Sequence, residues 1–344
     1  MLALGGCAEP EPKVMRLATG DDAEGRPILW PSLPETPRYA YVGELTGEPN
    51  FEPVKGPGER STAVRVLSWL AGLGLDEPRP LVLQRPQSGV TDRTGRILVT
   101  DVSHRAVFVF DPVDARLEVW ASAADATPFE APIGIVATDE GFLVTDAELG
   151  AVFRLGHDGR PLGQFGGDAL IRPTGITRDT AGGRIFVADT RANDIKIFDD
   201  AGLLIDYVGR SGDARGELNS PTHISYADGR LYVVDTLNSR VQVFDSDGRV
   251  LNVFGERGLY VGNLARPKGI AVDASGNIYV VEGLYDHLLV FDRDGHFLLP
   301  IGGTGKAPGQ FYLPAGVWTD ARSRVYVADM FNGRVSIFQF LGGS

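Results

Sequence analysis

The sequence is almost free of cysteine, because Cys7 is the single one among 344 residues. One thiol cannot form an internal disulfide, and it cannot build the cysteine clusters that hold structural zinc. Histidine is nearly as scarce, with five residues spread along the chain. We therefore expect a hydrophobic core, and neither disulfides nor metal ions, to hold the fold together.

Positive charge is also scarce. Lys and Arg number 33 against 45 Asp and Glu, which gives a formal net charge of -12 at pH 7. A nucleic-acid-binding surface needs a concentration of cations to neutralise phosphates, and the basic residues here are scattered. The sequence argues against a nucleic-acid partner. No apolar run reaches the ~20 residues of a membrane-spanning helix, so a membrane could be reached only through an anchor.

The lone cysteine offers a possible anchor. The chain begins MLALGGCAEPEPK, and its segment Leu4–Cys7 resembles a bacterial lipobox, in which the cysteine becomes the lipidated first residue. Only six residues precede Cys7, so the basic and apolar regions of a full leader are missing. The alternatives are a lipid anchor at Cys7 with a leader that starts upstream, and an ordinary N-terminus. Residues 1–37 are interpreted as this start followed by a Pro/Glu-rich extended linker, partly disordered.

The chain contains an internal sequence repeat. A short apolar string that ends in an acid recurs six times, at steps of 43 to 47 residues, and a large apolar residue stands nine positions after each acid. The acids are Asp101, Asp146, Asp189, Asp235, Glu282 and Asp329, and the apolar residues are Phe110, Leu155, Phe198, Phe244, Phe291 and Phe338. A Pro-x-Gly motif precedes most of the acids. The first unit matches it loosely, with Pro86 and Gly89, and the fourth has His223 in place of the glycine.

Each unit holds four short strand candidates, in which β-branched and aromatic residues alternate between Gly/Asp turns. Four strands in 40 to 50 residues are typical of a propeller blade. We predict an all-β fold, a six-bladed β-propeller of four-stranded antiparallel blades, with its repeats over residues 86–341 of a domain spanning 38–344. The last unit lacks an outer strand. Residues 38–43 are expected to supply it and close the ring, because an open ring leaves unpaired edges, and residues 61–71 are expected to form a short helix.

The repeated acid, the apolar residue nine positions after it and the Pro-x-Gly motif together resemble the NHL repeat. The strings that carry the resemblance are PKGIAVDASGNIYVVE at 267–282, VVDTLNSRVQVFD at 233–245 and VADMFNGRVSIF at 327–338, within a match over about 89–340. With the lipobox-like start, the chain is most similar to bacterial six-bladed NHL lipoproteins. This resemblance implies an exported protein, lipid-anchored on the periplasmic side of the envelope. Ala8, directly after Cys7, is compatible with transfer to the outer membrane, so we expect the outer rather than the inner membrane. The resemblance implies no single activity, since NHL propellers include binding proteins, lyases and sensor-attached domains.

Few residues are candidates for chemistry. The six acids are expected to accept backbone N–H groups in the turns that follow them. His223 is expected to point toward the central channel, where an imidazole could bind a ligand or a metal, or act as an acid or base. Some NHL-like lyases hold zinc with histidines from several blades, and the histidines here do not stand at matching positions. We therefore assign no catalytic residue, no metal site and no cofactor.

The longest loops are the best candidates for binding, because loops on a rigid scaffold usually carry function. They span 209–220, 255–266 and 302–313, and with His223 they supply the candidate ligand-binding residues Arg210, Arg215, Arg257, Tyr260, Arg266, Phe311 and Tyr312. The favoured function is a non-enzymatic scaffold that binds a protein, peptide or glycan. The alternatives are a metal-dependent lyase or lactonase with a site in the channel, and a structural component of an envelope or export complex.

Overall fold

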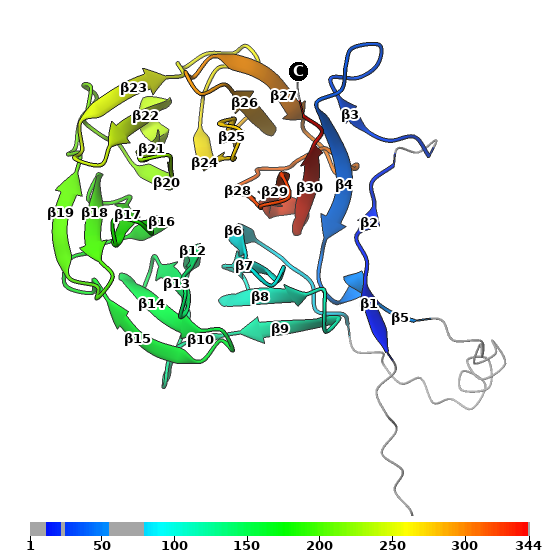
Figure 1. Cartoon of the computed structure of the whole chain (residues 1–344), viewed down its shortest axis with the longest axis horizontal. Helices are drawn as coiled ribbons and strands as arrows, with labels where there is room; N and C mark the ends of the chain where they lie inside the picture. Colours follow the sequence, from blue (N-terminus) through cyan, green and yellow to red (C-terminus); the bar gives the residue numbers. More distant parts are fainter. Residues whose placement is uncertain (1–11, 22–24, 55–78, 343–344) are drawn as a thin grey trace, which may run out of the picture.

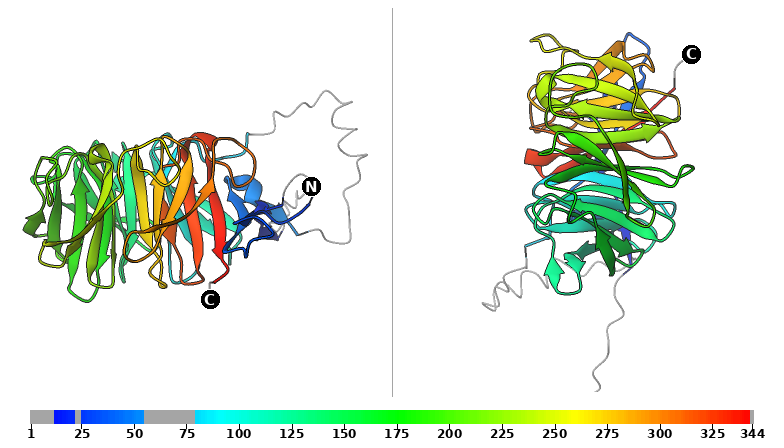
Figure 2. Two further views of the ribbon diagram at one scale, coloured as in Figure 1. Left: turned by 90° about the horizontal axis from the view of Figure 1, so that it is seen from above. Right: turned by 90° about the vertical axis from the view of Figure 1, so that its left-hand side faces the viewer.

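A computed structural model describes residues 12–21, 25–54 and 79–342. They form a six-bladed β-propeller of four-stranded antiparallel blades (Figure 1), which is a flat disc when it is seen from the side (Figure 2). The predicted fold is therefore confirmed. Cys7 and the predicted helix at 61–71 lie outside the described residues.

The strands of each blade follow one another from the central channel to the rim. Blade 1 holds β6 (Pro86–Thr91), β7 (Ile97–Asp101), β8 (Ala106–Asp111) and β9 (Arg116–Trp120); blade 2 holds β12 (Pro132–Ala137), β13 (Gly141–Asp146), β14 (Ala151–Gly156) and β15 (Pro161–Phe165); blade 3 holds β16 (Pro173–Asp179), β17 (Arg184–Asp189), β18 (Asp194–Asp199) and β19 (Leu204–Val208). Blade 4 holds β20 (Pro221–Ala227), β21 (Arg230–Asp235), β22 (Arg240–Asp245) and β23 (Val250–Phe254); blade 5 holds β24 (Pro267–Val272), β25 (Ile278–Glu282), β26 (His287–Phe291) and β27 (Phe297–Gly302); blade 6 holds β28 (Val317–Thr319), β29 (Arg324–Asp329), β30 (Arg334–Phe340) and β4 (Tyr39–Leu45).

The inner strands all start on one face of the disc, which we call the loop face. Each second strand ends there with the acid of the repeat, and in blade 2, for example, Pro132 pairs with Asp146. Each outer strand also ends on this face, and the chain then crosses it to reach the next inner strand. The loop face therefore collects the three long loops and the six acids, whereas the opposite face carries shorter turns.

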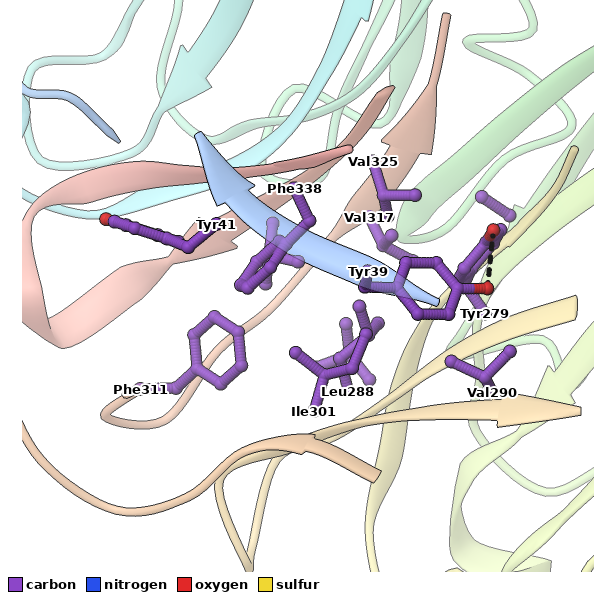
Figure 3. Packing of buried hydrophobic residues seen from close by; sticks show 13 residues of the cluster. Tyr39, Tyr41, Tyr279, Leu288, Val290, Ile301, Phe311, Val317, Val325 and Phe338 are labelled. Atoms are coloured by element: carbon purple, nitrogen blue, oxygen red, sulfur yellow. Dashed lines mark hydrogen bonds between the residues drawn. The ribbon is translucent and has the colours of Figure 1, made fainter. Parts of the chain in front are cut away.

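The ring is closed by β4, from before the first repeat. It pairs antiparallel with β30, with Tyr41 opposite Phe338 and Tyr39 opposite Phe340. Figure 3 shows how Tyr39 and Tyr41 pack in the cluster between blades 5 and 6, where the Tyr39 hydroxyl lies 3.1 Å from that of Tyr279. Burying an aromatic ring of this size contributes about 1.5 to 3 kcal/mol. The predicted closure is thus confirmed, and it is stabilised by core packing as well as by strand pairing.

The segment before β4 was expected to be an extended linker, and its described parts are more structured than that. β1 (Lys13–Met15) pairs with β5 (Phe51–Pro53), and both β2 (Ala18–Thr19) and β3 (Leu29–Trp30) pair with β4. Trp30 packs edge-on against Phe338 of β30, with ring centroids 5.4 Å apart. A short η1 (Glu48–Asn50) precedes β5, and a hairpin of β10 (Ser122–Ala124) and β11 (Thr127–Pro128) follows blade 1. Apolar contacts and strand pairing on the edge of β4 thus order residues that composition alone assigned to a linker.

Candidate functional site

The six repeat acids are structural. All are at most 1% exposed, and each accepts N–H groups from the residues that lead into the inner strand of its own blade. In blade 1 the N–H groups of Gln84 and Arg85 lie 2.7 and 2.9 Å from Asp101 Oδ2. In blades 1, 2, 3 and 5 the acid also accepts N–H bonds from the turn that follows it, as predicted. Sequence reasoning found that turn contact and missed the second one, which holds each loop against its blade.

In blades 4 and 6, side chains replace the backbone N–H groups of the following turn as partners of the acid. Asn238 and Arg240 bind Asp235 in blade 4, and Asn332 and Arg334 bind Asp329 in blade 6. Arg240 also donates to the carbonyls of Ala214 and Glu217, which lie in the loop that enters blade 4. These Asn-x-Arg residues therefore contact the acid of their own blade and the loop that enters it, and they hold two of the three long loops in place.

The inner strands surround a central channel with a cavity of about 180 Å³, which His223 lines. At Gly175, the equivalent position of the preceding blade, an added Cβ would lie 2.7 Å from both the His223 Cα and the Thr222 oxygen, because neighbouring inner strands approach closely. His223 is the one histidine among these strands, and it lines this cavity.

The first repeat departs from the predicted motif. Ser88, not Gly89, takes the position of the motif glycine, since its N–H bonds Thr100 Oγ1 as the Gly134 N–H bonds Thr145. Gly89 is instead needed one residue later, where an added Cβ would lie 2.5 Å from the Trp318 ring of blade 6. The indole of Trp318 thus occupies the space that a side chain at position 89 would enter.

His223 is electrostatically unusual. It is 9% exposed, and both ring nitrogens are buried and make no hydrogen bond with any residue that the structure describes. Burial and, after it, the positive charge of Lys268 lower its pKa to about 4, although the backbone carbonyls of Lys268 and Gln87 favour the protonated ring. The imidazole is thus neutral at pH 7. Among the described residues, no three His, Cys, Asp or Glu side chains lie together to hold a metal ion.

The candidate loop residues do not form one site. Phe311 is 0% exposed and packs against Phe338, so it is a core residue and its assignment to ligand binding is wrong. Arg210 forms an ion pair with Glu217, and Arg215 bonds the carbonyls of Val250 and Leu251 on the outer strand of blade 4. Those two guanidinium groups therefore lie toward the rim. Arg257 donates to Ser239, between the rim and the channel.

Tyr260 belongs to an exposed apolar patch. It is 83% exposed, its neighbour Leu259 is 85% exposed, and Val261 and Leu284 are also exposed. We call these four residues the Tyr260 patch. They line a hollow of about 290 Å³ on the loop face of blade 5, which Glu282 and His287 also line. Large exposed apolar side chains that gather around a hollow mark a surface for binding.

Tyr312 lies over blade 6 and not in the same hollow. Its ring packs edge-on against that of Phe331, with centroids 5.7 Å apart, and the Arg85 guanidinium lies 5.8 Å from the Phe331 ring. Leu237, Leu284 and Phe331 stand two residues after the acids of blades 4, 5 and 6. All three are about half exposed. This shared offset is a signal in the sequence that the spacing of the acids alone does not reveal.

Arg266 lies near the channel mouth. Its charge helps to lower the pKa of Lys268, which stands two residues on in the Pro-x-Gly position of β24. Sequence reasoning named Arg266 and missed Lys268, although Lys268 is the one basic residue at the middle position of this motif in the six repeats.

The described residues form no helix that is long and apolar enough to cross a membrane. A family profile described as 6-bladed beta-propeller matches residues 214–284, and no curated protein matches the sequence.

Among solved structures, the chain is similar to a virginiamycin B lyase from Staphylococcus aureus, with 13% identity and a TM-score of 0.55 over 75% of this chain and 96% of that chain. It is similar to a gluconolactonase from Xanthomonas campestris, with 18% identity and a TM-score of 0.55 over 76% of this chain and 89% of the other. It is also similar to an auxiliary nutrient binding protein from Bacteroides thetaiotaomicron, with 13% identity and a TM-score of 0.57 over 74% and 69% of the two chains. At such identities the likeness shows the propeller fold alone.

Proposed function

We propose that this propeller, built from NHL-type repeats, is a non-enzymatic binding scaffold that holds an apolar segment of a protein or peptide on the Tyr260 patch. The observation that carries the proposal is the exposure of Leu259 and Tyr260 beside a hollow, on a loop that a rigid blade supports. Tyr is enriched among the residues that dominate binding energy, because its ring offers a large contact area at a low cost in side-chain entropy. The loop is fixed at its base, where the Asn263 side chain accepts the Tyr260 N–H at 3.0 Å.

Replacing Tyr260 by alanine should weaken peptide binding at least tenfold, as expected when a central aromatic contact is truncated. The probes are peptides selected on the wild-type protein from a displayed random library, and their affinities are measured by fluorescence polarisation. Tyr207→Ala is the matched control, because Tyr207 is 64% exposed on the outer strand of blade 3. Selected peptides that bind wild type and the Tyr260 variant equally well would contradict the assignment.

We further propose that Cys7 carries a lipid anchor that holds the propeller on the periplasmic side of a bacterial outer membrane. The support is the resemblance of Leu4–Cys7 to a lipobox. In a bacterial host that expresses the gene extended upstream, a fatty-acid analogue should label the wild-type protein and not the Cys7→Ser variant. Equal labelling of both proteins, or labelling of neither, would refute the anchor.

A further inference from the structure

Three cations lie together at the mouth of the central channel on the loop face. Lys268 stands on the inner strand of blade 5, Arg266 precedes that strand, and Arg85 precedes the inner strand of blade 1. Burial lowers the pKa of Lys268, and the charges of Arg266 and Arg85 lower it further, so both arginines lie near this lysine. We call them the cation cluster.

The charges of the cluster are not neutralised by ion pairs. Among the described residues, the side-chain nitrogens of Lys268, Arg266 and Arg85 lie within 4 Å of no carboxylate and form no hydrogen bond, and the guanidinium of Arg85 lies over the Phe331 ring. Glu282 is near Arg266, but its carboxylate is buried and already accepts the N–H groups of Arg266 and Leu284. By contrast, Arg105 and Arg172 on the same face each pair with a glutamate. Arg266 and Arg85 are exposed, and Lys268 is partly buried. An unpaired cation at the partly buried position reduces stability unless a ligand supplies the counter-charge.

His223 supplies an independent sign of a ligand. This residue is more than nine-tenths buried and lines the channel, and its two ring nitrogens form no hydrogen bond within the described part of the chain. Thr222, the residue before His223, donates its hydroxyl to the Lys268 carbonyl at 3.0 Å, so His223 stands beside Lys268. The charge of Lys268 accordingly lowers the pKa of the His223 ring. A neutral imidazole offers one N–H donor, and an unused buried donor next to unpaired cations is suited to an oxygen-rich anion.

We propose that the channel mouth binds a compact anion that carries carboxylate or phosphate groups, held by Lys268, Arg266 and Arg85 and hydrogen-bonded by His223. Arginine forks match the geometry of carboxylate and phosphate oxygens, and the lysine ammonium adds a point charge at the entrance. This site lies at the channel and not on the Tyr260 patch, so it goes beyond the proposed peptide binding. The source of the anionic group is either a free small molecule or an acidic side chain of a polypeptide.

The test measures binding of citrate, inorganic phosphate and a triaspartate peptide to the full chain by calorimetry at constant ionic strength. Lys268→Met should weaken binding roughly tenfold or more, as expected for loss of a charge-assisted hydrogen bond. Lys306→Met is the matched control, because Lys306 is an exposed lysine on the loop 302–313 of the same face. Binding of citrate or phosphate supports a free anion as the source, and binding of the peptide alone supports an acidic polypeptide.

Stability separates a ligand site from a merely structural lysine. Without anion, Lys268→Met should melt at the same temperature as wild type or higher, because the substitution removes repulsion within the cluster. If that variant fails to fold, Arg85→Gln provides the same test at an exposed residue. The proposal is overturned if no probe binds, or if Lys268→Met and Lys306→Met change affinity equally. Tyr260→Ala should leave the affinity for citrate unchanged, so this proposal and the peptide proposal can fail separately.

Discussion

Replacing Arg334 by alanine should lower the free energy of unfolding by about 3 to 5 kcal/mol, the usual cost of leaving buried charges without their partner. The Arg334 side chain is buried at the seam of the ring, where it binds Asp329 at 2.8 Å and Glu44 of the closing strand at 2.6 Å. It also donates to the carbonyls of Lys306, Ala307 and Gln310 in the loop that enters blade 6. Burial raises the pKa of Asp329, so the substitution leaves a carboxylate that is costly to ionise.

The matched control is Arg240→Ala in blade 4. Arg240 bonds Asp235 at 2.8 Å and two loop carbonyls in the same way, but it does not contact the closing strand. We expect Arg334→Ala to cost more than Arg240→Ala, because it also breaks the link from β30 to Glu44, 290 positions away in sequence. Urea unfolding followed by tryptophan fluorescence gives both values. Equal losses would show that the ring closure does not depend on this contact.

The repeat acids and the large apolar residues nine positions after them made the fold predictable from the sequence. The constant spacing of nine residues between the acid and the large apolar residue reflects a hairpin of fixed register. In blade 4, for example, Asp235 pairs with Arg240 and Leu231 pairs with Phe244. The closing strand was predictable for a different reason: the last repeat ended early, and a residue pattern like that of the other outer strands stood before the first one. Both inferences use local periodicity, which the sequence displays directly.

The binding residues were less predictable, because their exposure depends on packing between loops and blades. Phe311 and Tyr312 are neighbours with similar chemistry, yet Phe311 packs in the core and Tyr312 lies on the surface. Lys268 was overlooked because a single lysine in a strand motif has no neighbours in sequence that reveal the charges beside it. Arg85, which completes the cation cluster, is separated from Lys268 by 183 positions and is brought near it only when the ring closes.

Acidification should destabilise the protein through His223. The folded pKa of this ring is lowered to about 4, whereas an unfolded histidine titrates near 6.5. Between these values the unfolded chain binds a proton that the folded chain does not, so stability is fully present above about pH 6.5 and is lost as the pH falls toward 4. Titration of His223 should therefore lower the free energy of unfolding by about 2 to 3 kcal/mol between pH 7.5 and pH 4.5. Lys268 strengthens the effect, since its charge opposes a second one in the channel.

The variant His223→Gln removes this dependence, because the amide is neutral and of similar size. The free energy of unfolding is measured at pH 7.5 and at pH 4.5. Its decrease between these two pH values should be smaller in the variant than in wild type, by the roughly 2 to 3 kcal/mol attributed to the ring. His157→Gln is the control, since His157 is exposed in a turn of the opposite face, where its ring hydrogen-bonds the Asp139 carbonyl. Carboxylates elsewhere titrate in all three proteins and cancel in the comparison. If the His223 variant loses as much stability on acidification as wild type and the control, the imidazole is solvated and the channel does not enforce its neutral form.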